Sequence, residues 1–247
     1  MASKKLSICL IIKDEHEYLS EWLEWHAEQG ADHFYIYDNG SCPPIETAIT
    51  AALRSRCTVV PFSSRSFRTQ IAAYRHCLEH FAEDSEWMAF IDTDEFIRPI
   101  AFHGIPEFLD GLPEDADAVL LRWIVYGADG QVRKRTAPVR ERFRIPVDYP
   151  AWWPMCKSII RPARVHGMDV HVPVQTDREL KIVNEYGKPL ASMRDSDLTA
   201  ETIAIDHYFT RSLEEWREKM KRGSVDGICQ RDYRLFFRLN PDMKEEG

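Results

Sequence analysis

Short apolar runs alternate with helix-like patterns along the first hundred residues. Leu6–Ile12 is an apolar run of the kind found in strands that are buried on both faces. Apolar residues then recur at three- and four-residue spacing, which predicts an amphipathic helix that Gly30 ends. Asp14 and Glu17 have the spacing of a capping box at the start of this helix. The alternation continues, with strands predicted at 33–37, 57–62 and 87–91 and a helix at 71–81.

Strands that alternate with helices predict an α/β fold, with a Rossmann-type, mostly parallel sheet flanked by helices. In such sheets, ligands bind beyond the carboxyl ends of the strands. Polar clusters follow three of the predicted strands, and we expect these clusters to converge on one crevice. The clusters are Lys13-Asp14-Glu15, Asp38-Asn39 and Asp92-Thr93-Asp94-Glu95.

The pattern is less regular after residue 100. It predicts a helix at 105–109, strands at 118–125, 157–161 and 170–174, and a basic loop at 127–138. Ser212 and Glu215 form a second capping box, and Gly223 closes the helix that follows. Residues 231–247 are polar, and we expect them to form a loosely attached tail.

Composition narrows the range of functions. The chain has 247 residues and a formal net charge of −8, which suits one domain and disfavours binding of nucleic acid, because phosphate neutralisation needs a basic surface. The apolar run between Lys5 and Lys13 is too short for a signal peptide or a membrane span. The six cysteines are scattered without a CxxC pair. We therefore expect free thiols, a cytoplasmic location and, at most, peripheral contact with a membrane.

Two aspartates at the end of the strand predicted at 87–91 carry the strongest chemical signal. Asp92 and Asp94 lie two residues apart, so in extended chain their side chains point the same way. Neighbouring carboxylates repel each other and are costly to desolvate unless a cation lies beside them. Mg²⁺ or Mn²⁺ bound to a diphosphate meets that need. The D-x-D patterns at 115–117 and 195–197 lie in polar stretches, and we interpret them as solvated loop charges.

Ordered sequence blocks run through most of the chain. They are Lys13-Asp14-Glu15, Glu21-Trp22-Leu23-Glu24-Trp25-His26 with Gly30, Phe34-Tyr35-Ile36-Tyr37-Asp38-Asn39-Gly40-Ser41, Gln70 with Ala73-Tyr74 and Cys77, Phe90-Ile91-Asp92-Thr93-Asp94-Glu95-Phe96, Glu141-Arg142-Phe143, Lys157-Ser158-Ile159-Ile160-Arg161-Pro162, His171, His207-Tyr208-Phe209, and Lys219 with Arg222-Gly223. Together these blocks resemble the glycosyltransferase family-92 type and its bacterial family-2-like relatives. Asp14 stands where such sequences commonly have Asn, and residues 104–138 match only loosely, which leaves the acceptor side less defined than the donor side.

The resemblance implies a GT-A fold and a nucleotide-sugar donor, usually a UDP-sugar, whose diphosphate is held by Mn²⁺ or Mg²⁺. Residues 1–100 would form the nucleotide-sugar-binding half of one domain, residues 101–230 its acceptor-binding half, and residues 231–247 the tail. The implied reaction is transfer of the sugar to a hydroxyl of a carbohydrate or glycan acceptor, with inversion, in glycan or surface polysaccharide synthesis. Carried over by position, Asp38 would lie at the nucleoside with Lys13, Asn39 and Gln70 near it, Asp92 would face the ribose or the metal, and Asp94 and His207 would bind the metal.

Inverting transfer needs a general base beside the acceptor hydroxyl. Glu141 is the first candidate, Asp169 the second and His171 the third; Glu141 lies between two arginines and equally suits a structural ion pair. Arg161 and Arg211 are candidates for stabilising the departing diphosphate, and each also suits a surface position. Within the aromatic segment 149–154, Trp152-Trp153 can stack on a sugar ring or pack in the core.

Three other functions fit parts of the pattern. A HAD-type phosphohydrolase also places D-x-D after a strand, but Phe96 stands where it would have Thr or Val. A nucleotidyltransferase shares the metal-binding aspartates but would have a glycine-rich loop in place of Lys13-Asp14-Glu15-His16. A carbohydrate-binding protein without catalysis would keep the same fold, and the intact aspartate cluster argues against it.

Overall fold

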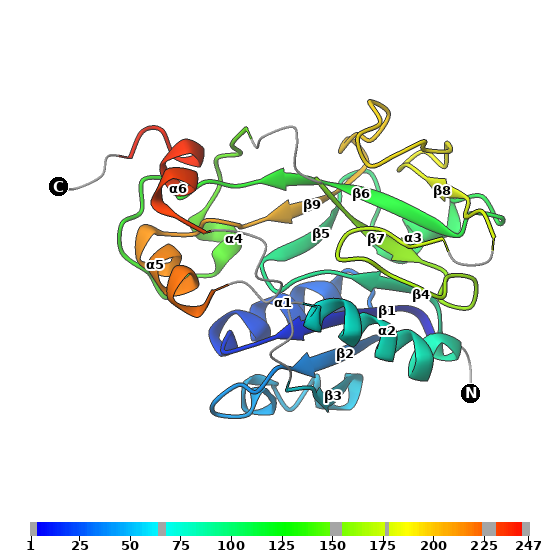
Figure 1. The fold of residues 1–247 in the computed structure, drawn as a ribbon, viewed down its shortest axis with the longest axis horizontal. Helices are drawn as coiled ribbons and strands as arrows, with labels where there is room; N and C mark the ends of the chain where they lie inside the picture. Colours follow the sequence, from blue (N-terminus) through cyan, green and yellow to red (C-terminus); the bar gives the residue numbers. More distant parts are fainter. Residues whose placement is uncertain (1–3, 64–67, 149–154, 176–177, 224–230, 244–247) are drawn as a thin grey trace.

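The computed structural model describes residues 4–63, 68–148, 155–175, 178–223 and 231–243. Its strands form one sheet in the order β3-β2-β1-β4-β7-β6-β9-β5, with β8 paired to β6 (Figure 1). The strands are β1 (Lys4–Ile12), β2 (His33–Asp38), β3 (Cys57–Pro61), β4 (Ser85–Phe90), β5 (Glu95–Pro99), β6 (Ala118–Val125), β7 (Cys156–Ile160), β8 (Ile182–Val183) and β9 (Ile203–His207). The helices are α1 (His16–Glu28), α2 (Thr69–Phe81), α3 (Ile105–Asp110), α4 (Val139–Arg142), α5 (Leu213–Arg222) and α6 (Tyr233–Leu239).

The first four strands form a parallel half-sheet between two helices. The pairs β3–β2, β2–β1 and β1–β4 are all parallel. Leu6, Ile8, Leu10 and Ile12 of β1 share one hydrophobic cluster with α1, whereas Cys9 and Ile11 share another with α2. Alternate residues of a strand face opposite sides, so α1 and α2 cover the two faces of β1. The expected α/β fold, a mostly parallel sheet flanked by helices, is confirmed.

The second half of the sheet is mixed. β7 lies antiparallel between β4 and β6, and β9 runs parallel to β6. β5 begins directly after the aspartates that follow β4, leaves that strand and pairs antiparallel with β9. This pairing places His207, at the end of β9, opposite Glu95. The chain therefore turns sharply at the D-x-D motif, and a strand from the C-terminal part reaches the same place.

Two local predictions are wrong. The capping box at Asp14 and Glu17 does not form, because Asp14 has a φ of 52° and its carboxylate accepts a hydrogen bond from the Cys42 N–H at 2.9 Å. The helix begins at His16 instead. The strand predicted at 170–174 is reduced to one isolated bridge between Met168 and Pro173.

The interpretation of residues 231–247 as a loose tail is also wrong for residues 231–243. Phe236 and Leu239 of α6 are buried in the main core. The Asn240 side-chain oxygen accepts a hydrogen bond from the Ala128 N–H at 2.5 Å, which fastens the end of α6 to the basic loop. The aromatic segment 149–154, with Trp152-Trp153, lies outside the described residues.

The state of the cysteines and the length of the helices can be compared with the sequence analysis. The five cysteines within the described residues are all free, and Cys229 lies outside those residues. Of the helices described, none has the length and apolar character needed to cross a bilayer.

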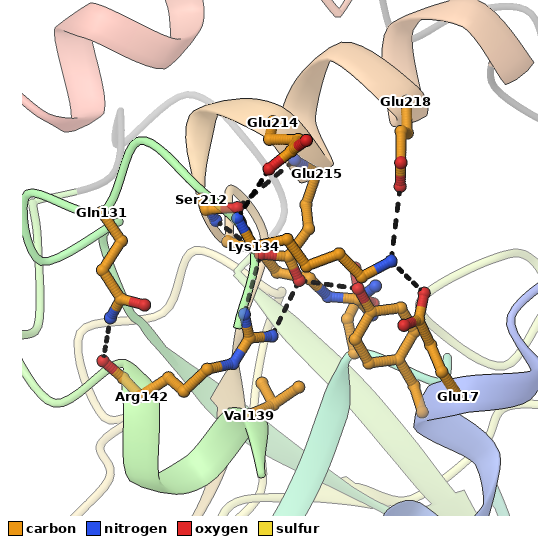
Figure 2. Close-up of polar contacts among 12 residues, drawn as sticks. Glu17, Gln131, Lys134, Val139, Arg142, Ser212, Glu214, Glu215 and Glu218 are labelled. Atoms are coloured by element: carbon orange, nitrogen blue, oxygen red, sulfur yellow. Dashed lines mark hydrogen bonds and ion pairs between the residues drawn. The ribbon is translucent and has the colours of Figure 1, made fainter. Parts of the chain in front are cut away.

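A buried carboxylate fastens α5 to α1 and α4. Glu215 pairs with the Arg142 guanidinium through two hydrogen bonds of 2.7 and 3.0 Å, and Figure 2 shows Arg142 reaching up from α4 to this group. Tyr18 of α1 donates its hydroxyl hydrogen to the same carboxylate at 2.6 Å. Ser212 completes the capping box predicted from the sequence. Despite burial, Arg142 and the two hydroxyl groups lower the pKa of Glu215 to about 2.

We predict that Arg142→Met lowers the free energy of unfolding by about 3 kcal/mol, because it leaves the Glu215 charge buried without its guanidinium. Urea denaturation at pH 7 measures this loss. Arg133→Met is the matched control, because the Arg133 side chain is 84% exposed and lies 3.8 Å from Glu214, and it should cost less than about 1 kcal/mol. Equal losses in the two variants would contradict the structural role given to the buried pair.

Candidate active site

The carboxyl ends of β1, β2 and β4 lie side by side. Ile12 at the end of β1 pairs with Asp38 at the end of β2, and the Asn39 N–H donates to the Ile12 carbonyl at 2.8 Å. The Ile91 N–H donates to the Cys9 carbonyl, which brings the start of the aspartate motif to the same edge. The three predicted polar clusters therefore follow neighbouring strands on one edge of the sheet.

Asp38 closes the loop that follows β2. Its two carboxylate oxygens accept hydrogen bonds from the Ser41 N–H at 2.8 Å and the Ile45 N–H at 3.2 Å. Asp38 and Asn39 are 8% and 9% exposed. Each carboxylate oxygen can accept a second hydrogen bond, so Asp38 can hold both this loop and a ligand.

Asp92 is held from two sides. The Gln70 side-chain amide donates to one carboxylate oxygen at 2.8 Å, and the Lys157 ammonium donates to the other at 2.9 Å. Gln70 lies at the start of α2 and also donates to the Tyr74 hydroxyl, so it joins the helix to the motif. Lys157 is 1% exposed. The structure thus brings together two predicted residues, Gln70 and Asp92, and adds a buried lysine.

Asp94 meets α5 and β9. The Lys219 ammonium donates to its Oδ2 at 2.6 Å, whereas its Oδ1 lies 3.6 Å from the His207 Nε2 atom. Burial opposes the charge of Asp94, but Lys219 and His207 hold its pKa well below the usual range. Burial lowers the pKa of His207, against the opposing effect of Asp94, and thereby favours the neutral imidazole. Burial also lowers the pKa of Lys219, to about 8, although Asp94 favours its charged form.

Glu95 lies behind the two aspartates and is fully buried. Its Oε2 accepts a hydrogen bond from the Asp92 N–H at 3.0 Å and lies 3.8 Å from the Lys157 ammonium. Its Oε1 and the Nδ1 atom of His207 have no hydrogen-bond partner among the described residues. Burial raises the pKa of Glu95 well above its usual range, against the opposing effect of Lys157.

Glu15 connects the end of β1 to α5 and to the motif. Its carboxylate accepts hydrogen bonds from Arg211 at 3.0 Å, Arg222 at 2.8 Å and the Thr93 hydroxyl at 2.9 Å. Arg222 also donates to the Asp14 carbonyl at 3.2 Å. Although burial disfavours its charge, Arg211 and then Lys219 lower the pKa of Glu15 to about 2.

The residues present fit a divalent ion that takes further ligands from a diphosphate. Within the described residues, no three His, Cys, Asp or Glu side chains form a group that could hold a metal alone. Sites of this kind often use one or two protein ligands together with substrate phosphates and water. Asp94 Oδ1 and His207 Nε2 are a carboxylate and a neutral imidazole that lie 3.6 Å apart, beyond hydrogen-bond range. That donor set suits Mn²⁺.

The three candidates for the general base lie in different places. Glu141 is exposed on α4, and no described contact joins its side chain to Asp92 or Asp94. Asp169 is exposed and accepts a hydrogen bond from the Val170 N–H at 2.7 Å. The His171 ring packs against Trp123, which also contacts the His207 ring. Burial lowers the pKa of His171 to about 3, so this ring is neutral.

Other predicted residues lie at or away from this edge. Lys13 is exposed, and its carbonyl accepts from Arg222 at 3.4 Å. Arg211 lies in the site, whereas Arg161 pairs with Glu86 near the start of β4, at the opposite end of that strand. The D-x-D pattern at 115–117 was interpreted as solvated loop charges. This interpretation is wrong for Asp117, which is 2% exposed and pairs with Arg178.

A model of glycosyltransferase family 92 matches residues 4–228. The chain belongs to glycosyltransferase family 92. A family 92 protein of Oryza sativa subsp. japonica is 32% identical over 93 residues, which are 38% of this chain and 16% of that protein. One from Ricinus communis is 28% identical over 94 residues, which are 38% of this chain and 17% of that protein. The match thus spans about a sixth of the length of these family 92 relatives.

Two solved structures show partial likenesses to this family 92 chain. Staphylococcus aureus TarS 1–349 has a TM-score of 0.40 and 16% identity, over 64% of this chain and 47% of that one. Glucosyl-3-phosphoglycerate synthase of Mycobacterium tuberculosis, in complex with Mn²⁺, uridine diphosphate and glucosyl-3-phosphoglycerate, has a TM-score of 0.31 and 19% identity. That second likeness covers 51% of this chain and 46% of the synthase.

The sequence analysis assigned no role to two lysines that form ion pairs with the aspartates, Lys157 with Asp92 and Lys219 with Asp94. Lys157 is the charged residue in the fully buried strand β7, and Lys219 lies three residues after the buried Trp216 on α5. A lysine on the apolar side of a strand or helix needs a buried counter-charge, because an unpaired buried charge is strongly unfavourable. A lysine among apolar residues of a strand or helix was therefore the sequence signal that could have identified both residues.

We predict that Glu15→Gln lowers the free energy of unfolding by about 3 kcal/mol at pH 7, because Arg211 loses its buried counter-charge. The folded pKa of Glu15, about 2, lies below its ordinary value of 4.5. Its contribution is therefore fully present above pH 4.5 and is lost as the pH falls through about 2. Urea unfolding between pH 7 and pH 2 should show wild type and variant converging at acid pH.

Glu17→Gln is the control, because the Glu17 side chain is 51% exposed and forms a surface pair with Lys134. It should change stability by less than about 1 kcal/mol. A difference between wild type and Glu15→Gln that does not depend on pH would count against the charge pairing.

Proposed function

We propose that this family 92 chain transfers a sugar from a nucleotide-diphosphate donor, a UDP-sugar, to an acceptor hydroxyl with inversion. The observation that supports this best is the meeting of Asp94 and His207 at the strand edge that also carries Asp38 and Asp92. A carboxylate and a neutral imidazole at the carboxyl ends of parallel strands suit a cation-bound diphosphate. Family membership favours sugar transfer over phosphohydrolase or nucleotidyltransferase chemistry.

Asp94 and His207 would hold Mn²⁺ or Mg²⁺, which when bound acts as a Lewis acid on the diphosphate leaving group. Asp38 and Asn39 would bind the nucleoside, with Lys13 at the rim and Gln70 fixing the orientation of Asp92. Residues 1–100 would bind the donor and residues 101–230 the glycan acceptor. Glu141, Asp169 and His171 are the proposed bases, and His171 is connected to the metal-binding pair by its packing against Trp123, which in turn contacts His207.

We predict that Mn²⁺ strengthens UDP binding at least about tenfold over binding in EDTA, and that Asp94→Ala loses most of this gain. Isothermal titration calorimetry measures both. Asp195→Ala is the control, because Asp195 belongs to another D-x-D pattern, is only partly buried and accepts hydrogen bonds within its own turn. It should keep the full gain. An Asp94→Ala variant with the wild-type response to Mn²⁺ would remove the metal assignment.

The donor can be identified by thermal shift with a panel of UDP- and GDP-sugars, with and without Mn²⁺. A ligand that binds only the folded chain raises the melting temperature. We expect a UDP-sugar with Mn²⁺ to give the largest rise and to support transfer to a glycan acceptor. Pyrophosphate release from a nucleoside triphosphate would support a nucleotidyltransferase instead.

A further inference from the structure

Cations outnumber carboxylates where α5 meets the strand ends. Arg211, Lys219 and Arg222 contact two carboxylates, those of Glu15 and Asp94. The Nε atom of Arg211 is also buried without a hydrogen-bond partner among the described residues. A cluster with more cationic donors than carboxylate acceptors is suited to an anionic ligand.

Lys219 has one N–H that the described part of the chain does not use. An ammonium group has three N–H donors. Two of them reach acceptors, Asp94 Oδ2 at 2.6 Å and the Phe209 carbonyl at 2.7 Å. The Lys219 side chain is only 3% exposed, and no third acceptor from the described residues bonds to it. A buried donor without an acceptor is unfavourable, so a ligand oxygen at this position would be stabilising.

Lys157 provides a contrast within the same site. Its ammonium lies 2.9 Å from Asp92 and 3.8 Å from Glu95, so two carboxylates surround one cation. Lys219 instead has one carboxylate and one neutral carbonyl. Lys157 thus has carboxyl oxygens of two residues close to its ammonium group, whereas Lys219 has one carboxylate and keeps an N–H for another acceptor.

We propose that Lys219 belongs to the donor site, and that its ammonium group binds an oxygen of the diphosphate while it keeps its hydrogen bond to Asp94 Oδ2. This inference rests on the proposed function. Asp94 Oδ1 faces His207 and stays available to a divalent ion. Two cations on one carboxylate repel each other. Lys219 therefore supports binding of a diphosphate without metal, and it weakens binding of a divalent ion when no diphosphate is present.

The first test measures binding of UDP and uridine in EDTA by isothermal titration calorimetry. Wild type should bind UDP more tightly than uridine, and Lys219→Met should lose at least about tenfold in UDP affinity with little change for uridine. Lys219→Arg keeps the charge and should retain most of the UDP affinity. Lys221→Met, an exposed position on the same helix, is the control and should match wild type.

The second test titrates the free protein with Mn²⁺ alone, followed by the electron paramagnetic resonance signal of unbound Mn²⁺. Lys219→Met should bind Mn²⁺ more tightly than wild type, because the competing ammonium is gone. A purely structural lysine would instead give weaker Mn²⁺ binding together with a lower melting temperature, and that result overturns the proposal.

Wild type and Lys219→Arg together decide the matter if Lys219→Met does not fold. Equal affinity of wild type for UDP and uridine in EDTA overturns the proposal, and tighter UDP binding that Lys219→Arg preserves supports it. Failure of the proposed function is distinguishable from this result, because it would appear as no Mn²⁺-dependent gain in UDP binding and no sugar transfer.

Discussion

The pairing of buried carboxylates with cations from α5, and with Arg211 just before that helix, is the interaction on which the site depends. Asp94 and Glu15 lie at the ends of different strands, and their charges are stable there because Lys219, Arg211 and Arg222 reach them. Removing one member of a buried ion pair is strongly unfavourable, because it leaves the other charge without compensation. The same contacts hold α5 against the parallel half-sheet. Structure and electrostatics at this edge are therefore set by the same side chains.

This arrangement changes how the acidic motif is understood. By composition alone, Asp92-Thr93-Asp94-Glu95 attracts a cation. In the folded chain each aspartate already has a lysine, and Glu95 is buried behind them. The edge thus combines a carboxylate oxygen that faces an imidazole with the ammonium group of Lys219, which has an N–H left for an anion. A metal-bound diphosphate has both kinds of charge, and both have a counterpart here.

The sequence predicted the parallel half of the fold well, because its signals are local. The apolar run of β1 and the helical spacing in α1 and α2 identify the elements to within a few residues. Strand ends then fix where Asp38, Asp92 and Asp94 lie, because parallel strands share an edge.

The rest of the site could not be predicted in this way, because it depends on contacts between distant segments. Nothing local to β5 or β9 indicates that Glu95 will face His207. Asp14 looked like a helix cap, but its carboxylate bonds to Cys42 in another loop. Residues 231–247 were interpreted as a polar tail, yet the apolar side chains of Phe236 and Leu239 are buried in the core. His207 was named only through the family resemblance, and its position beside Asp94 depends on the tertiary structure.

The wide sequence separation of the α5 contacts has a consequence for assembly of the molecule. Asp94 and Lys219 are 125 residues apart, and Glu15 and Arg211 are 196 apart. Contacts this distant require closure of long loops, which slows their formation. During synthesis, β1 to β4 leave the ribosome well before Arg211 and α5, so the carboxylates at the strand edge lack these partners until that later segment has been made. The charge at this edge of the sheet in the nascent chain therefore differs from the charge in the folded protein.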